Sequence, residues 1–290
     1  MQVDLDNAYR FCKEIAVNHY ENFPVGSLLI PSDKRKYIYS IYAFARHADD
    51  IADSDKYTEA EKFSLLNGFD TELDKIRNND LKSLLPDNKN IFYALSNTID
   101  ELKIPEIEFR DLLIAFKQDA VRQRYETFDE LIEYSSYSAN PIGHLVLYTF
   151  GYSPEKDRKI FEYSDTICTA LQLANFWQDV SVDLKIRRVY VPSKVMKDFE
   201  YDESMLYDKI ENDNFRGAIE YLVKETKKYF IEGNEIIDLV KGRLKLELKA
   251  TIAGGMKILD KIEKINYNVL SERVSINNID KLKILGKIFW

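Results

Sequence analysis

Three oxygen-bearing side chains stand four residues apart in the stretch from Leu171 to Pro192. They are Asn175, Asp179 and Asp183. An α-helix brings residues at this spacing onto one face, with a rise of about 6 Å between neighbours. Apolar residues surround the stripe on both sides, and a buried carboxylate is costly unless it is paired or bound to a metal. The stripe therefore predicts a helix face that binds a cation.

A second acidic cluster repeats this arrangement earlier in the chain. Asp49 and Asp53 have the same spacing, and Asp50 stands between them. Hard oxygen ligands suit Mg²⁺, which keeps several waters and commonly bridges a few carboxylates to substrate phosphate oxygens. We therefore expect one shared site for Mg²⁺ and a diphosphate, whose metal ligands are Asp49, Asp50, Asp53, Asn175, Asp179 and Asp183. Two solvated acidic helix faces are the alternative.

Cationic and phenolic side chains accompany both clusters. Arg46 precedes Asp50 by one helical turn, and Arg187 and Arg188 closely follow Asp183. A guanidinium group binds phosphate oxygens in a fixed fork, so these residues are candidates for holding the same diphosphate. The alternative for each is a salt bridge to a neighbouring aspartate. Tyr42 and Tyr190 are candidate hydrogen-bond donors to the diphosphate, or members of the core.

Other familiar motifs are absent from the sequence. His19, His47 and His144 are scattered, without the spacing of a zinc site, and we interpret them as structural. There is no glycine-rich phosphate loop, so side chains and metal must hold the phosphate, and no motif supports a dinucleotide cofactor. Cys12 and Cys168 are too few and too far apart for a disulfide framework.

Composition narrows the class of protein. The 290 residues are 45% hydrophobic and 31% charged, with only ten Gly and seven Pro, which is typical of a helix-rich globular protein. A formal net charge of −8 argues against a general nucleic-acid binder. The sequence shows neither a secretory leader nor an apolar run long enough to span a membrane, which predicts a cytoplasmic protein.

Hydrophobic periodicity and the positions of helix-breaking residues predict an all-α fold with residues 1–290 in one domain. Helical periodicity recurs along the chain, every Pro lies near an expected boundary or kink, and no sustained alternation indicates strands. Asn140-Pro141-Ile142-Gly143 predicts a kink that opens a helix. The expected helices cover residues 4–20, 58–76, 91–102, 107–123, 127–143, 153–183, 204–239 and 244–270, and one further helix runs from an N-cap at Ser32 to the first aspartates.

The tail from Lys281 to Trp290 combines basic and apolar residues. Packing of a terminal helix on the core is the favoured interpretation. Peripheral contact with the inner face of the membrane is the alternative.

These motifs give the sequence a resemblance to the squalene/phytoene synthase family, which makes head-to-head isoprenoid products. The resemblance covers most of the chain and rests on YAFARHADDIAD, LQLANFWQDVSVD, RRVYVP and ILDKIEKINYNVLSERV. It implies an isoprenoid synthase fold, a helical bundle around a central cavity, with Mg²⁺ and a prenyl diphosphate substrate.

Within that family, HYENFPVG, YSANPIG and NFWQDV resemble the hydroxysqualene synthase branch. Gln178 stands where the wider family commonly has Arg, and residues 138–141 replace a small apolar segment. The resemblance makes Gln178 and Asn175 candidate substrate-binding residues. The resemblance places Phe23 in the substrate pocket. Asn140 is a candidate for positioning water, with helix capping as the alternative.

The branch implies ionisation of presqualene diphosphate, with capture of the rearranged cation by water, and no NADPH. It also implies functional coupling to other enzymes of the squalene pathway. Two alternatives remain. One is head-to-head condensation by a presqualene diphosphate, squalene or phytoene synthase, and the other is a catalytically inactive helical lipid-binding homologue.

Overall fold

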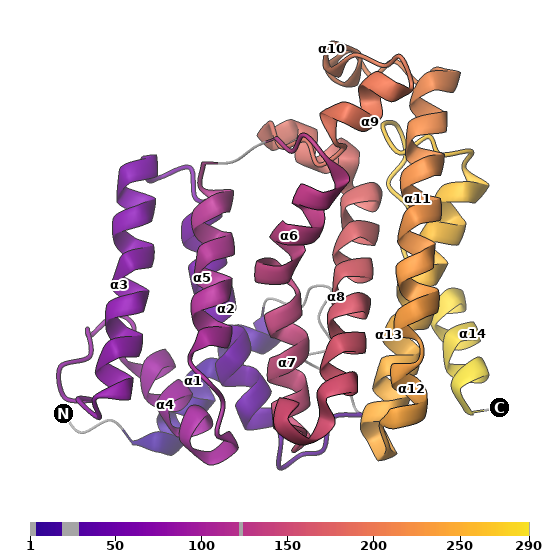
Figure 1. The fold of residues 1–290 in the computed structure, drawn as a ribbon. Helices are drawn as coiled ribbons and strands as arrows, with labels where there is room; N and C mark the ends of the chain where they lie inside the picture. Colours follow the sequence, from indigo (N-terminus) through magenta and orange to yellow (C-terminus); the bar gives the residue numbers. More distant parts are fainter. Residues whose placement is uncertain (1–3, 19–28, 122–123, 290) are drawn as a thin grey trace. The chain divides into compact units, whose positions relative to one another are not determined.

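A computed structural model describes residues 4–18, 29–121 and 124–289, without the side chains of residues 287–289. Helices make up its regular structure (Figure 1). In the described residues the only β-type pairing is one isolated bridge, between Arg124 and Val189. The all-α prediction is confirmed.

The chain divides into two compact units. Unit 1 comprises residues 1–122 and 141–158, and unit 2 comprises residues 123–140 and 159–290. The expectation of one domain over residues 1–290 stays a prediction.

Unit 1 is organised around helix α2, which carries the first aspartate cluster. α2 packs against α1, α3, α4 and α5. Its Phe44 is fully buried, and the rings of Phe69, Phe92 and Phe109 lie around it with centroids 5.3–5.8 Å away. Such aromatic contacts hold the face of α2 opposite the acidic one. The helices of this unit are α1 (Leu5–Asn18), α2 (Arg35–Asp53), α3 (Glu59–Arg77), α4 (Lys89–Leu102), α5 (Ile107–Asp119) and most of α7 (Asn140–Thr149).

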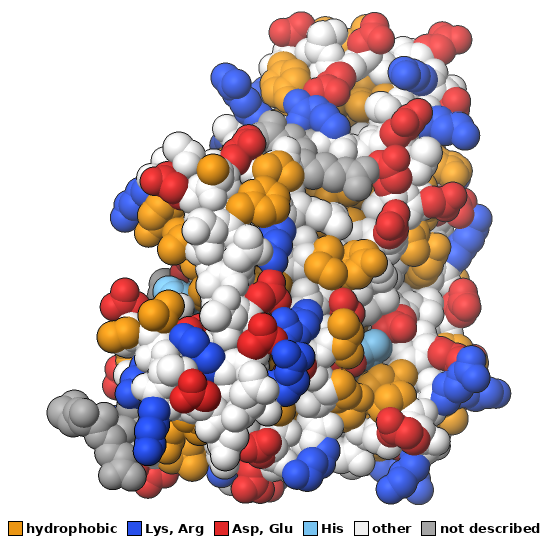
Figure 2. Space-filling view, turned by 60° about the vertical axis from the view of Figure 1, so that its left-hand side comes forward, with side chains coloured by type: hydrophobic (Ala, Val, Ile, Leu, Met, Phe, Trp, Pro, Cys, Tyr) orange, Lys and Arg blue, Asp and Glu red, His pale blue; other side chains and the backbone are white. Residues whose placement is uncertain are grey.

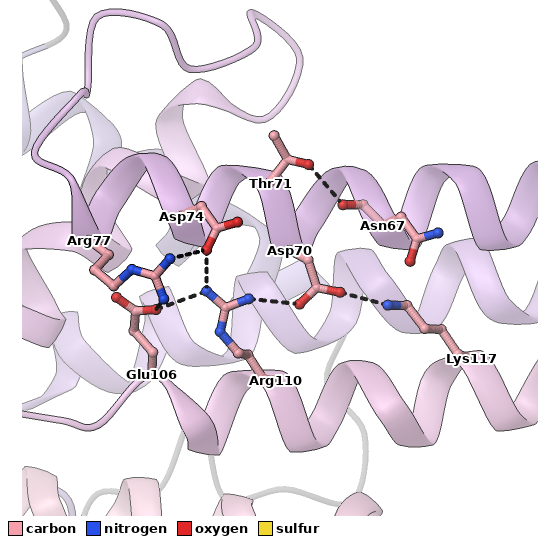
Figure 3. Close-up of polar contacts among 8 residues, drawn as sticks. All are labelled: Asn67, Asp70, Thr71, Asp74, Arg77, Glu106, Arg110 and Lys117. Atoms are coloured by element: carbon pink, nitrogen blue, oxygen red, sulfur yellow. Dashed lines mark hydrogen bonds and ion pairs between the residues drawn. The ribbon is translucent and has the colours of Figure 1, made fainter.

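An ion-pair network joins α3 to α5 in unit 1 (Figure 3). The guanidinium of Arg110 on α5 contacts Asp70 at 3.1 Å, Asp74 at 2.8 Å and Glu106 at 3.0 Å. Lys117, two turns further along α5, holds the other oxygen of Asp70 at 2.6 Å. One arginine thus holds three carboxylates from two helices, which fixes the register of α3 on α5.

Unit 2 is organised around helix α8, which carries the second cluster and lies beside α11 and α13 (Figure 1). The buried Trp177 donates its indole N–H to Thr226 Oγ1 on α11 at 2.7 Å. At Gly255 of α13, a β-carbon would clash with Phe230 of α11 and lie 2.9 Å from Leu171 of α8, so the glycine favours close packing of these helices. The helices are α6 (Phe128–Ser138), α8 (Pro154–Asp183), the 3₁₀ turn η1 (Leu184–Ile186), α9 (Ser193–Asp198), α10 (Glu203–Tyr207), α11 (Asp213–Gly233), α12 (Ile236–Leu239), α13 (Gly242–Lys264) and α14 (Asn278–Phe289).

Two of the predicted helix boundaries have informative outcomes. The break near Asn140 is confirmed, because Ala139 leaves helical geometry at φ −122° and ψ −44° between α6 and α7. The N-cap at Ser32 is wrong. α2 begins at Arg35 after a turn in which the Lys34 amide donates to the Pro31 carbonyl, and Lys34 occupies the cap position without a side-chain bond.

The long helices predicted in the last third of the chain are also wrong in extent. Residues 204–239 form α10, α11 and α12, because Lys209 adopts φ 52° and Asn212 then starts α11 by accepting the Phe215 amide at 2.9 Å. The helix predicted for residues 244–270 ends at Lys264, since Asn266 and Tyr267 have φ values of 53° and 61°.

The surface drawn in Figure 2 carries charges of both signs. Lys and Arg side chains are interspersed there with Asp and Glu side chains. Within the described part of the chain, no helix is long and apolar enough to cross a membrane.

Candidate active site

The first aspartate cluster lies at the carboxyl end of α2. Asp49 lies among three further carboxyl groups, which are Asp50, Asp53 and the half-buried Asp119 at the end of α5. Burial, followed by the charge of Asp53, raises the pKa of Asp49 to about 7, although nearby Arg46 opposes the shift and Asp119 and Asp50 add to it. The negative charge of an ionised carboxylate in this position is poorly compensated, so a bound cation would stabilise it.

Arg46 is the cation that the sequence placed one turn before this cluster. Its guanidinium lies 2.7 Å from Asp50 and 3.7 Å from Asp49. The intramolecular salt bridge that was one interpretation of Arg46 is therefore present. Asp50 is solvent-exposed and serves as the close partner of Arg46, so its role as a metal ligand stays a prediction.

Two other side chains of α2 pack against residues of unit 1 itself. Tyr42 is half-buried against a small core cluster that includes Ala16, Ile30 and Ile38. His47 bonds Asn88 Oδ1 at 2.9 Å through Nε2 and stacks on Phe69 at a centroid distance of 5.5 Å. The structural interpretation of His47 fits these contacts.

The second cluster follows α8 to its last residue, as the spacing predicts. Asn175, Asp179 and Asp183 are all half-buried, whereas Phe176 and Val180 between them are buried. A small hollow opens at the end of the helix, and Asp183 lines it together with Arg188 and Tyr190. The structure thus brings together an acidic, a cationic and a phenolic side chain that the sequence proposed for one diphosphate site.

The chain after α8 is shaped to present Arg188 at this hollow. Arg187 adopts a left-handed backbone at φ 61°, and the Arg188 amide then donates to the Asp183 carbonyl at 2.9 Å. Arg124 stabilises this turn. Its guanidinium donates to the Arg187 carbonyl at 2.5 Å and pairs with Glu203 at 2.6 Å.

Tyr190 belongs to an aromatic wall of the hollow. It is 9% exposed and stacks on Phe176 with a centroid distance of 3.9 Å and an interplanar angle of 11°. Tyr125 lies on Tyr190 at 5.6 Å, and Tyr134 is 6.0 Å from Phe176. The ring of Tyr190 is therefore part of the core, which was one of its two interpretations, and it also lines the hollow.

The sequence did not single out Arg273, which lies in the loop before α14. Its guanidinium forms a bidentate salt bridge with Asp179, at 2.5 Å to Oδ1 and 3.1 Å to Oδ2. Arg273 belongs to the VLSERV segment that carried part of the resemblance, and that membership was the available signal. No local spacing links it to a partner 94 residues away.

The remaining predicted residues have structural partners or lie outside the description. Gln178 is buried and donates its side-chain amide to the Val274 carbonyl at 2.7 Å, beside Arg273. Asn140 begins α7, and its Oδ1 accepts the Thr169 hydroxyl at 3.2 Å. Phe23 and His19 lie outside the described residues. Substrate roles for Gln178, Asn140 and Phe23 stay predictions.

The two aspartate clusters offer a partial donor set for the predicted Mg²⁺. Among the residues that the structure describes, no three His, Cys, Asp or Glu side chains converge closely enough to hold an ion. Mg²⁺ is usually held by one or two carboxylates together with waters and substrate phosphates. The crowded Asp49 in unit 1 and the oxygen stripe of α8 in unit 2 fit such a partial set. That the two clusters form one site stays a prediction.

Several known proteins are similar in sequence to this chain. The sequence model of squalene/phytoene synthase matches residues 16–280. A 15-cis-phytoene synthase of Synechococcus elongatus is 24% identical over 96% of this chain and 91% of its own length. A hydroxysqualene synthase of Zymomonas mobilis is 34% identical over 178 residues, which are 61% of this chain and 56% of the relative.

Solved structures agree with this relationship. The crystal structure of squalene synthase HpnC from Alicyclobacillus acidocaldarius superposes with a TM-score of 0.82 at 33% identity, covering 92% of this chain and 97% of the other. A dehydrosqualene synthase structure gives a TM-score of 0.84 at 23% identity, with coverages of 98% and 96%, and supports the fold alone. The predicted isoprenoid synthase fold is confirmed. With its aspartate motifs, its fold and a family match from residue 16 to residue 280, the chain belongs to the squalene/phytoene synthase family.

Proposed function

We propose that this enzyme is a hydroxysqualene synthase, which converts presqualene diphosphate and water into hydroxysqualene and diphosphate. One observation carries the choice within the family. The chain is 34% identical to a hydroxysqualene synthase over the matched segment, whereas its phytoene synthase relatives are 23–25% identical. The departures at Gln178 and at residues 138–141 point to the same branch.

The reaction needs no reductant. The C–O bond to the diphosphate breaks, and its electron pair leaves with the diphosphate. The resulting cyclopropylcarbinyl cation rearranges, and water then forms a new C–O bond and loses a proton. Because no electrons are gained, no NADPH is required.

The diphosphate is the group that the charged residues would bind. Arg46 and Tyr42 on α2, and Arg188 and Tyr190 at the hollow, would donate hydrogen bonds to its oxygens as negative charge develops. When bound, Mg²⁺ would supply Lewis-acid stabilisation of that charge. Its proposed ligands are Asp49, Asp50, Asp53, Asn175, Asp179 and Asp183.

The organic part of the substrate requires a different environment. Phe176 and Tyr190 line the hollow with buried aromatic rings, which would exclude bulk water from a carbocation there. Asn140 is the proposed water-positioning residue, and its bond to Thr169 would fix the orientation of its amide.

Product analysis tests the proposal. Purified enzyme with Mg²⁺ and without NADPH is incubated separately with presqualene diphosphate and with farnesyl diphosphate, and the products are identified by mass spectrometry. Hydroxysqualene from presqualene diphosphate is expected. Presqualene diphosphate or phytoene formed from a simpler prenyl diphosphate would replace the proposal with the condensation alternative.

A matched pair of variants separates an enzyme from an inactive homologue. Asp179→Asn removes one charge from the stripe, and we expect turnover to fall by at least about a hundredfold. Asp238→Asn, at a side chain that is 84% exposed, is the control and should keep wild-type turnover. Absence of turnover in the wild type with every prenyl diphosphate tested would favour the lipid-binding homologue.

A further inference from the structure

The terminal helix α14 exposes a stripe of large apolar side chains. Ile279 is 63% exposed, Leu282 is 70% exposed and Leu285 is 43% exposed. Their spacing of three residues places them within about 120° of one another around the helix axis, so they form one continuous face.

This stripe is not what holds α14 on α13. The opposite face carries Asp280, which is 6% exposed and pairs with Lys257 at 3.7 Å and with Lys261. Ile284, one turn later on the same side, is partly buried. Asn277 and Asp280 also cap the start of the helix reciprocally, since each accepts the other's amide at 2.9–3.1 Å. The helix is therefore docked by one face while another apolar face points to solvent.

Positive charge flanks the exposed stripe. Lys281 and Lys283 are solvent-exposed, and the helical period places them on opposite sides of Leu282 at about 100° from it. Residues 281–290 contain three Lys and no Asp or Glu, although the whole chain has a net charge of −8. The acidic side chain of α14, Asp280, is neutralised by two lysines of α13. The exposed part of α14 is thus locally cationic on an acidic protein.

We propose that α14 binds an anionic lipid surface, with Ile279, Leu282 and Leu285 inserted at the headgroup boundary. Lys281 and Lys283 extend to the lipid phosphates on either side. An apolar stripe with a lysine on each side is typical of helices that lie in a membrane interface, and anionic lipid adds attraction for each lysine. The inference is independent of which prenyl diphosphate the enzyme uses.

Vesicle binding by the full-length protein tests this inference. The protein is sedimented with phosphatidylcholine vesicles that contain or lack phosphatidylglycerol. We expect binding to the anionic vesicles and its weakening by salt, because lysine–headgroup attraction is screened. Equal binding to both kinds of vesicle, or none to either, would overturn the proposal.

Variants assign the binding to the stripe. Leu282→Ser should lower the vesicle partition coefficient by at least about tenfold, and Ile279→Ser should act in the same direction. Ile231→Ser is the matched control, because Ile231 is 69% exposed on α11 and is not part of the stripe on α14. Lys281→Gln with Lys283→Gln should lower binding and flatten its salt dependence.

Two further measurements keep the result decisive. Circular dichroism and the thermal midpoint should be unchanged in Leu282→Ser, since the side chain is solvent-exposed. Analytical ultracentrifugation tests a second copy of the chain as the occupant of the stripe. A dimer that Leu282→Ser dissociates, or vesicle binding that survives in that variant, would overturn the proposal.

Discussion

Replacing Asp49 by asparagine should stabilise the metal-free protein and abolish its activity. The pKa of this carboxyl is raised from its ordinary value of 3.8 to about 7 by burial and then by Asp53. Each pKa unit corresponds to about 1.4 kcal/mol, so the unscreened effect would be about 4 kcal/mol. The side chain is 39% exposed, and screening by solvent reduces the expected gain to about 1–2 kcal/mol.

The gain must depend on pH in a defined direction. Between the unfolded and the folded pKa, the folded state binds more protons than the unfolded state. Wild-type stability therefore falls as pH rises from about 4 to about 7 and is then flat with respect to this group. Asparagine cannot ionise, so the advantage of Asp49→Asn should be larger at pH 8 than at pH 5.

Urea unfolding in EDTA, followed by circular dichroism, measures this difference. Asp50→Asn is the matched control on the next residue. Its carboxylate lies 2.7 Å from Arg46, and losing that partly exposed pair should cost about 0–1 kcal/mol at both pH values. An Asp49→Asn variant that is less stable than wild type, or whose gain does not change with pH, would refute the view of Asp49 as an uncompensated anion.

Four further outcomes follow from contacts within single units. Arg110→Met should lower the free energy of unfolding by about 1 kcal/mol in urea titrations, because Asp70, Asp74 and Glu106 each lose one cationic contact and keep one with Lys117 or Arg77, while turnover is retained. Thr226→Val should cost about 1–3 kcal/mol and alter tryptophan fluorescence, because it removes the acceptor of the buried Trp177 indole; an unchanged unfolding midpoint would contradict this. Burial raises the pKa of the Cys12 thiol to about 12, so Ellman's reagent should label Cys12 only after unfolding. Gln178→Leu and Arg273→Gln should each lower turnover, and their effects should combine to less than the sum of the two in a double-mutant cycle.

Local patterns in the sequence predicted the helix faces well, because periodicity acts over a few residues. Asn175, Asp179 and Asp183 form a half-buried stripe as their spacing requires, and Asn140 begins a new helix after the break at Ala139. The hollow that joins Asp183, Arg188 and Tyr190 was also foreseeable, since all three lie within eight residues of sequence.

Features set by single backbone residues were not foreseeable from the hydrophobic period. Residues 204–239 keep that period throughout, yet the left-handed Lys209 and the capping Asn212 divide them into separate helices. Asp119 was visible as a polar residue, but its approach to Asp49 depends on how α5 packs on α2. Non-local packing decides such neighbours.

The contacts of residues 271–275 change the interpretation of Gln178. Glu211 accepts the Ser271 amide at 2.9 Å, and Lys261 donates to the Ser275 carbonyl at 2.6 Å. Between these two anchors, Gln178 holds the Val274 carbonyl while Arg273 holds Asp179. The amide of Gln178 therefore fixes the segment that delivers a guanidinium to the neighbouring aspartate. A substitution at Gln178 would then act on Asp179 through Arg273, so its effect on catalysis needs no direct contact with the substrate.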